Sequence, residues 1–220
     1  MAVQGHSHHR PGLHLPSWRR TRAAAPAAGA RAAAGATAAT GTAAAVATGT
    51  VAARIGAVTR LLTGFVFLWA FLDKTFGLGY ATTAEQAWIE GGSPTQGYLG
   101  GVSAGPLESF FHNIAGATWA NWLFMLGLLG VGLALTAGVA LRPAAAAGTA
   151  MMALMWTAEW PLAQHLSDGS PSMSTNPVVD YHLIYALVLI ALAAYGAGRT
   201  WGLGRTWEEL PPVKHHGWLR

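Results

Sequence analysis

The stretch WANWLFMLGLLGVGLALTAGVAL, from Trp119 to Leu141, decides the fold because it carries no charged residue over its whole length. An α-helix rises ~1.5 Å per residue, so about 20 apolar residues are enough to cross a hydrocarbon core ~30 Å thick. This stretch exceeds that requirement. It therefore predicts a helix that crosses a membrane.

Three further stretches are similar and carry a few charges near their ends: Ile55 to Phe76, Ala144 to Gln164 and Val178 to Gly198. In the first, we expect Arg60 to extend along its aliphatic stem toward water, which lets that helix begin several residues earlier. The short Arg142-Pro143 link makes the second and third spans antiparallel neighbours. The predicted fold class is all-α, a four-transmembrane-helix bundle over residues 54–210.

The cations indicate the orientation, since short loops rich in Lys and Arg stay on the cytoplasmic side of a membrane. Residues 1–60 hold seven arginines and no acid, and Arg142 and the cations after residue 198 fall on the same side. We expect a multi-pass protein of the prokaryotic cell membrane with both termini in the cytoplasm and the lipid bilayer as its partner. The net charge of +4 then reflects topology, and no nucleic-acid surface is predicted.

The first 53 residues differ in composition, being rich in Ala, Gly, Thr and Arg and lacking large apolar side chains after Trp18. Such a segment cannot bury enough surface to offset its ordering entropy. We therefore expect residues 1–53 to be a disordered cytoplasmic tail, helical only just before the first span. A twin-arginine signal at Arg19-Arg20 is the competing interpretation, but Arg31 interrupts the region that would form its apolar core. Residues 211–220 are predicted to be a short cytoplasmic tail.

The segment from Gly77 to Ala117 is long for a connector and contains signals for short helices in an outer loop. Thr83 and Ser93 each precede a predicted start, and Pro106 is predicted to begin the third helix. In the third of these helices, apolar residues recur at helical spacing, which predicts an amphipathic helix on the outer membrane surface. Glu108 and His112 lie four residues apart on its other side, where an exposed pair is favoured over a ligand role.

Distances along the helices place three acids near the outer face. Counted at ~1.5 Å per residue from the inner arginines, Asp73, Glu159 and Asp180 lie about 20 to 28 Å away. Ionisable groups at such depth are costly and usually pair with one another or mark a functional path. Glu159 shares a helical stripe with Met155 and Met152, so it is predicted to face the bundle interior.

Lys74 and His182 lie beside two of these acids and complete a candidate site at the outer end. Two structural alternatives remain open. Asp73 and Lys74 can simply lie at the membrane interface, and Asp180 can stabilise the start of the fourth helix after Asn176-Pro177. Asp180 and His182 are also about 200° apart around a helix, so at most one of them can point at the bundle centre.

Small residues predict where the helices pack closely, because association in lipid depends on close backbone approach. Gly130, Ala134 and Gly138 repeat every four residues in the second span, and Gly148 has the same role in the third. Interior packing within one bundle is favoured over a dimer interface for these residues.

Composition excludes several cofactors. The chain has no cysteine, so it has no disulfide and no Cys-ligated iron–sulfur cluster or zinc of its own. A haem between spans usually needs two facing histidines, and only His182 lies within a predicted span, so no haem or metal site is predicted. Trp160 is best interpreted as an interfacial anchor, with ring stacking on a quinone as the minority interpretation.

Four spans, a first helix with Arg60-Leu61-Leu62-x-Gly64 that ends in Asp73-Lys74, and a fourth opening with Asn176-Pro177-x-x-Asp180-Tyr181-His182 together carry a resemblance. Over residues 55–207 the chain resembles the DoxX family, in the branch similar to DoxD, the large membrane subunit of thiosulfate:quinone oxidoreductase. The resemblance implies a small partner subunit, a quinone as electron acceptor and thiosulfate as substrate.

On that resemblance, thiosulfate is expected to approach Lys74 from the outer face, with Asp73, His182 and His112 as further substrate-binding residues. Glu159 and Asp180 are the expected catalytic residues, which deliver protons to the quinone. The alternative is a non-catalytic membrane scaffold that recruits a partner protein through its basic tail and the amphipathic segment from Trp201 to Leu210.

Overall fold

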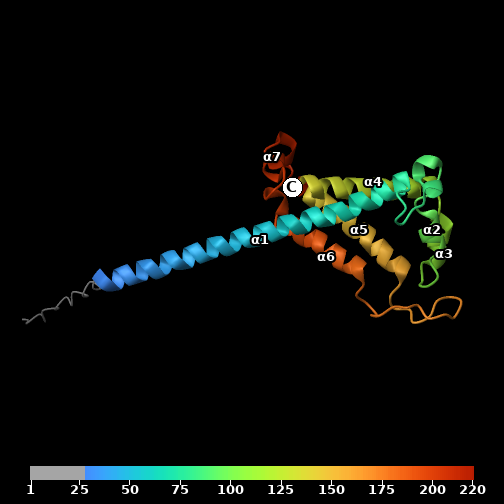
Figure 1. Cartoon of the computed structure of the whole chain (residues 1–220), viewed down its shortest axis with the longest axis horizontal. Coiled ribbons are helices and arrows are strands. Elements are labelled where there is room, and N and C mark those ends of the chain that lie inside the picture. The colour runs from blue at the N-terminus through green and yellow to red at the C-terminus, as the bar shows by residue number, and fades with distance from the viewer. Residues whose placement is uncertain (1–27) are drawn as a thin grey trace, which may run out of the picture. The chain divides into compact units, whose positions relative to one another are not determined.

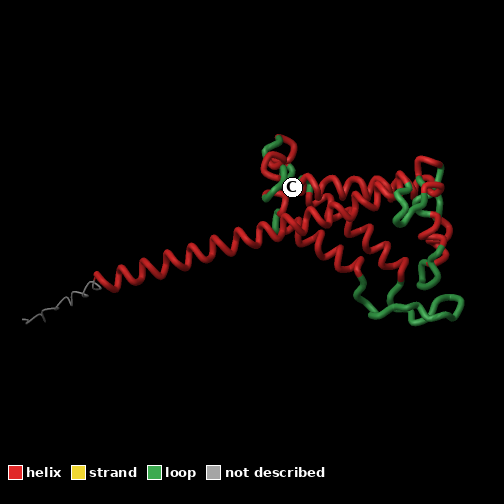
Figure 2. Tube along the Cα trace, viewed as in Figure 1, coloured by secondary structure: helices red, strands yellow, loops and turns green. Residues whose placement is uncertain are grey.

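The computed structural model describes residues 28–220, with side chains from Gly49 onward. Regular structure in this range is helical throughout, apart from one isolated β-bridge between His165 and Pro171 (Figure 2). Residues 46–220 form one compact unit of the chain. The predicted all-α class is confirmed for the described residues.

Four long helices form the main elements: α1 (Ala28–Phe76), α4 (Thr118–Ala137), α5 (Leu141–Glu159) and α6 (Tyr181–Ala194) (Figure 1). Among residues 49–220, two segments are long and apolar enough to cross a membrane, namely Gly49–Phe76 of α1 and the whole of α4. Helix α6 is apolar but shorter. The described chain is therefore all-helical with two candidate membrane spans.

Helix α1 begins at Ala28, inside the segment predicted to be a disordered tail. The physical reason is that alanine, which dominates this segment, has the highest helix propensity of all residues. The part of that prediction that concerns residues 1–27 lies outside the described residues.

The helix ends differ from the predicted spans by a few residues. Helix α5 stops at Glu159 because Trp160 takes a left-handed conformation, with φ of 40°, and Pro161 follows. Helix α6 begins only at Tyr181, since Asp180 is its N-cap. The link between α4 and α5 is the turn at residues 138–140, so Arg142 and Pro143 lie in the first turn of α5 and do not form the connection.

The core lies where the four helices meet, and side chains from each of them fill it: Phe67, Met125, Val131, Met152 and Leu189. Gly148 packs as predicted, because a Cβ there would lie 2.6 Å from Leu189. In α4 the tightly packed glycine is Gly132, where a Cβ would lie 2.7 Å from Leu68 of α1. The predicted packing residue Gly130 is exposed and has nothing within 4 Å of its Cβ position.

Arg60 does not extend toward water as expected, because its side chain is fully buried. Its guanidinium donates to the carbonyls of Leu135 and Thr136 at the end of α4 and to the Trp201 carbonyl at 2.8 Å. Helix C-termini leave carbonyls without intrahelical partners and attract cations. Arg60 therefore joins α1 to the end of α4 and to the segment after α6.

The segment between α1 and α4 contains four short elements: η1 (Ala84–Gln86), η2 (Trp88–Glu90), α2 (Gln96–Gly100) and α3 (Glu108–Ile114). Helices α2 and α3 each begin one or two residues after the start predicted from Ser93 and Pro106. The side-chain oxygen of Asn121 in α4 accepts from the Ser93 hydroxyl at 3.0 Å and from the amide and hydroxyl of Thr95. These bonds fasten the segment onto the start of α4.

After α6, the chain forms η3 (Ala197–Arg199), α7 (Gly204–Glu208), α8 (Pro211–His215) and η4 (Gly217–Leu219). The predicted C-terminal tail is thus mostly helical. The Trp207 indole donates to the Leu219 carbonyl at 2.7 Å, and Val213 is buried. These contacts fold the last residues back onto α7.

Candidate functional site

Residues 46–220 have two ends of different chemistry. The loop end holds the segment between α1 and α4 and the connection between α5 and α6. The arginine end holds Arg60, Arg142 and Arg199. The predicted functional residues all belong to the loop end, where they occupy three separate surroundings.

The first surrounding is a cavity of about 350 Å³, called here the loop-end cavity. Its walls come from the end of α1 and from α2, α3, α4 and α5, and they are mostly aliphatic and aromatic side chains. The described lining residues are Lys74, Pro94, Thr95, Tyr98, Leu99, Phe110, Phe111, Ile114, Trp119, Ala120, Leu123, Phe124, Met151, Leu154 and Met155. Lys74 is the one charged residue among them.

Lys74 is placed by its neighbour Asp73. The Asp73 carboxylate is 2% exposed and accepts from the amides of Tyr80 at 3.2 Å and Ala81 at 2.9 Å. These bonds fix the turn that follows α1. The Lys74 ammonium then lies 6.0 Å from the ring centroid of Phe124, within the range of a cation–π contact. Asp73 thus has a structural role, and its oxygens are already used by main-chain donors.

Tyr98 is a polar side chain of the cavity wall, together with Lys74 and Thr95, and no sequence pattern indicates it. Its hydroxyl donates to the Met155 carbonyl at 3.4 Å. Burial, followed by the charge of Glu159 and a hydrogen bond to it, raises the pKa of Tyr98 far above its usual range. Tyr98 therefore stays a neutral phenol at the junction of the cavity and Glu159. A lone tyrosine in a glycine-rich segment gives no sequence signal for this position.

Glu159 is exposed, so the prediction that it faces the bundle interior is wrong. It is the last residue of α5, where the chain leaves the helix, and the stripe that it shares with Met152 and Met155 ends at the surface. The Glu159 carboxylate lies beside Tyr98, and Tyr98 lines the loop-end cavity. Glu159 itself is not among the lining residues.

Asp180 and His182 form the second surrounding. Asp180 is the N-cap of α6 and accepts from the Leu183 amide at 3.0 Å, so its interpretation as helix chemistry is confirmed. Its other oxygen lies 2.7 Å from Nδ1 of His182, whose side chain is 1% exposed. Because a carboxylate accepts, Nδ1 carries the proton, and the buried Nε2 has no partner among the described residues. The predicted angle of about 200° between Asp180 and His182 assumed that both lie in the helix. It does not apply, because Asp180 is the N-cap and lies before the first helical turn.

The third surrounding contains the remaining predicted residues. His112 is exposed, and its Nε2 lies 2.7 Å from the Val102 carbonyl. Glu108 accepts from the Ser167 hydroxyl at 2.6 Å, so each member of the predicted pair has a different partner. Trp160 packs on Trp156 and on Gly105, and among described residues it is not part of the cavity lining.

The arrangement suits an apolar molecule with a polar head. Cavities of roughly 300 to 1,000 Å³ with a few placed polar groups are typical of small-molecule sites. In residues 28–220 no group of three or more His, Asp or Glu side chains is arranged to hold a metal ion. No family model, curated protein or solved structure matches this chain.

Proposed function

We propose that this chain is a four-span membrane protein of the DoxX kind that binds a quinone in the loop-end cavity and passes to it electrons from thiosulfate. The cavity carries the proposal, because it is apolar, has one cation in its wall and is bordered by exposed apolar side chains. Trp119, Leu123 and Leu154 all line it and are more than half exposed. In a bilayer such side chains face lipid, so a quinone can enter from the membrane.

Helices α5 and α6 supply the third and fourth spans of the proposed bundle. Both are too short or too polar to count as spans by themselves, but each packs in one core with α1 and α4. The loop end then faces outward and the arginine end faces the cytoplasm, following the distribution of Lys and Arg.

Two polar groups of the cavity fit a quinone head. The Lys74 ammonium can donate to one carbonyl oxygen of the quinone. The single proton of the Tyr98 hydroxyl is shared with the Met155 carbonyl at 3.4 Å, so Tyr98 donates to the quinone only when it turns away from that carbonyl. Phe110, Trp119 and Phe124 offer ring faces for stacking, which stabilises aromatic pairs by ~0.5 to 1.5 kcal/mol. The lipid-facing aliphatic side chains suit the hydrocarbon tail of a quinone.

The electron balance of the proposed reaction also needs protons. Oxidative coupling of two thiosulfate ions through an S–S bond releases two electrons, and a quinone takes up those two electrons with two protons to form a quinol. Glu159 is exposed to water and lies beside Tyr98, so it is the group that can collect protons and return them to the cavity through the phenol.

Quinone binding by the purified protein tests the proposal. A short-chain quinone is titrated into detergent-solubilised wild type and Lys74→Met, with exposed Lys214→Met as the matched control. Loss of one charge-assisted hydrogen bond costs about 1.5 to 3 kcal/mol, so we expect roughly 10- to 100-fold weaker binding for Lys74→Met. Lys214→Met is expected to bind like wild type. Equal affinity of all three proteins contradicts the proposal.

The scaffold is the second candidate, and two observations favour it. Glu159 and Asp180 lie outside the cavity wall, and exposed apolar side chains gather after α6, at Trp201, Leu203 and Leu210. A scaffold predicts that removal of residues 1–50 abolishes capture of a partner protein, whereas Glu159→Gln has no effect on thiosulfate-dependent quinone reduction in membranes. The enzyme predicts the opposite pair of results.

A further inference from the structure

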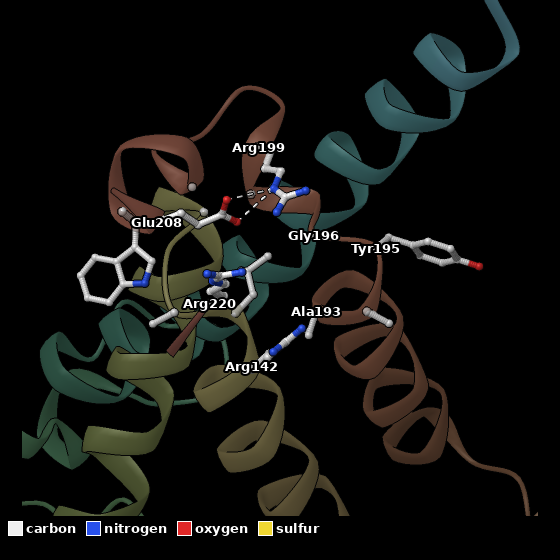
Figure 3. Close-up of a pocket in the computed structure, with 14 residues that line it drawn as sticks. Arg142, Ala193, Tyr195, Gly196, Arg199, Glu208 and Arg220 are labelled. Carbon is white, nitrogen blue, oxygen red and sulfur yellow. Dashed lines mark hydrogen bonds and ion pairs between the residues drawn. The ribbon is translucent and has the colours of Figure 1, made fainter. Parts of the chain in front are cut away.

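The arginine end contains a second cavity of about 260 Å³, called here the arginine-end cavity (Figure 3). It lies between the α4–α5 turn, the end of α6 and the segment that follows α6. Its described lining residues are Gly138, Ala140, Leu141, Arg142, Ala193, Ala194, Tyr195, Gly196, Gly198, Arg199, Gly204, Trp207, Glu208 and Arg220.

The walls of this cavity carry an excess of positive charge. Arg142, Arg199 and Arg220 line it, against one acidic side chain, Glu208. Arg199 is already paired, since its Nε lies 3.0 Å and 3.2 Å from the two Glu208 oxygens. Arg142 and Arg220 have no carboxylate side chain of their own among the described lining residues. Among the described lining side chains, positive charges therefore outnumber negative ones, which favours an anion in the cavity.

Main-chain groups of the C-terminal segment hold Arg142 at the cavity. The Arg142 guanidinium donates to the Gly217 carbonyl at 2.7 Å, and the Arg142 amide donates to the Arg220 main-chain oxygen at 2.8 Å. Gly138 and Gly198 both line the cavity, and their backbones lie close together, because a Cβ on Gly198 would lie 2.0 Å from the Gly138 carbonyl oxygen. Among the described contacts, the bonds of Arg142 use one of its guanidinium nitrogens and leave its other guanidinium N–H groups for a ligand.

We propose that the arginine-end cavity binds a phosphate group, either as the headgroup of an anionic lipid or as free phosphate. Arginine presents a planar fork of donors that matches phosphate oxygens in pairs. Tyr195 and Trp201, both largely exposed at this end, are the residue types that concentrate at membrane interfaces. Basic pockets at the cytoplasmic ends of membrane helices are where lipid phosphates bind. The inference rests on the membrane placement proposed above but is independent of quinone binding.

Lipid retention tests the inference. The protein is reconstituted in nanodiscs of phosphatidylcholine with one fifth phosphatidylglycerol, extracted, and the retained phosphatidylglycerol per chain is measured by native mass spectrometry. The test variant is Arg142→Gln with Arg220→Gln. The matched control is Arg54→Gln with Arg205→Gln, two exposed arginines outside the cavity lining. At about 1 kcal/mol for each arginine, we expect the test variant to hold phosphatidylglycerol roughly 30-fold more weakly, and the control to behave like wild type.

Glu208→Gln removes the acidic side chain of the lining and is expected to increase phosphatidylglycerol retention. A misfolded protein cannot show such an increase, so this variant gives a result even if the double variant fails to fold.

A second experiment adds inorganic phosphate to detergent-purified protein and measures the unfolding temperature. Stabilisation that the arginine substitutions abolish, without selective lipid retention, identifies free phosphate as the ligand. Retention and stabilisation that are the same in all variants overturn the proposal, and neither result depends on quinone affinity.

Discussion

Helix α1 carries one buried charge toward each end of the folded unit, and the two charges bond main-chain groups of opposite kind. Arg60 donates to carbonyls at the arginine end, where α4 terminates. Asp73 accepts from amides at the loop end, where the chain turns after α1. Each charge therefore satisfies backbone groups that a helix end or turn leaves unpaired. Buried charges in this protein mark points where the chain is held together.

Lys74 differs from both, although it is the neighbour of Asp73. It lines an apolar cavity and contacts a ring face, with no carboxylate ion pair among the described contacts of its ammonium. Arg60 and Asp73 thus stabilise the fold, whereas the Lys74 ammonium is available to a ligand. If so, substitutions of Arg60 and Asp73 lower the free energy of unfolding, measured in detergent.

Arg60→Leu is expected to have the largest effect. The substitution leaves the carbonyls of Leu135, Thr136 and Trp201 buried without their donor, and such changes cost about 3 to 5 kcal/mol. Arg54→Leu, at an exposed position of the same helix, is the control and should change stability by less than about 0.5 kcal/mol. Equal small effects for both would show that the Arg60 contacts contribute little.

Asp73→Ala is expected to be less damaging. The amides of Tyr80 and Ala81 lose their acceptor, but the turn that holds them includes exposed Tyr80, so water can replace part of what is lost. We expect a loss of about 2 to 3 kcal/mol. Asp73→Asn keeps one acceptor oxygen and should lose about half as much. If Asp73→Ala abolishes thiosulfate-dependent activity without any loss of stability, the structural role assigned to Asp73 is wrong.

Gly132→Ala tests the packing between α1 and α4 that both ends depend on. A Cβ at residue 132 would lie 2.7 Å from a Leu68 side-chain carbon and 2.8 Å from its amide nitrogen, and overpacking of this kind costs about 1 to 3 kcal/mol. Gly130→Ala, two residues away with open space, is the matched control. It should be neutral or stabilising by up to ~1 kcal/mol, since alanine favours the helix. The same loss from both substitutions would contradict the observed face of α4.

The sequence predicted the four helices well because long apolar runs leave few alternatives, and counting along the first helix placed Lys74 near the loop end. It failed on the direction of individual side chains. The Arg60 side chain was expected to reach water, but it is buried and donates to carbonyls of α4 and of the segment after α6, which are distant in sequence. Glu159 shares a stripe with buried methionines but lies at the last residue of its helix, where that stripe reaches the surface. Tyr98 enters the site only because Asn121 fastens its segment onto α4, and sequence spacing carries no information on such long-range contacts.

The ion pair of Lys214 and Glu209 is exposed, so we expect its substitution to change stability less than substitution of Arg60 or Asp73. The ammonium lies 2.7 Å from the carboxylate, and this hydrogen bond, followed by the Lys214 charge, lowers the pKa of Glu209. A lowered pKa in the folded state means that the pair stabilises the protein above the ordinary glutamate pKa of about 4.3 and loses that contribution as pH falls through the folded value. Glu209→Gln should therefore unfold at a slightly lower temperature than wild type at pH 7, and at the same temperature in acid below the folded pKa of Glu209. Added salt at pH 7 should shrink the difference, because exposed pairs are screened. A difference that persists in acid would show that the Glu209 side chain contributes through packing and not through its charge.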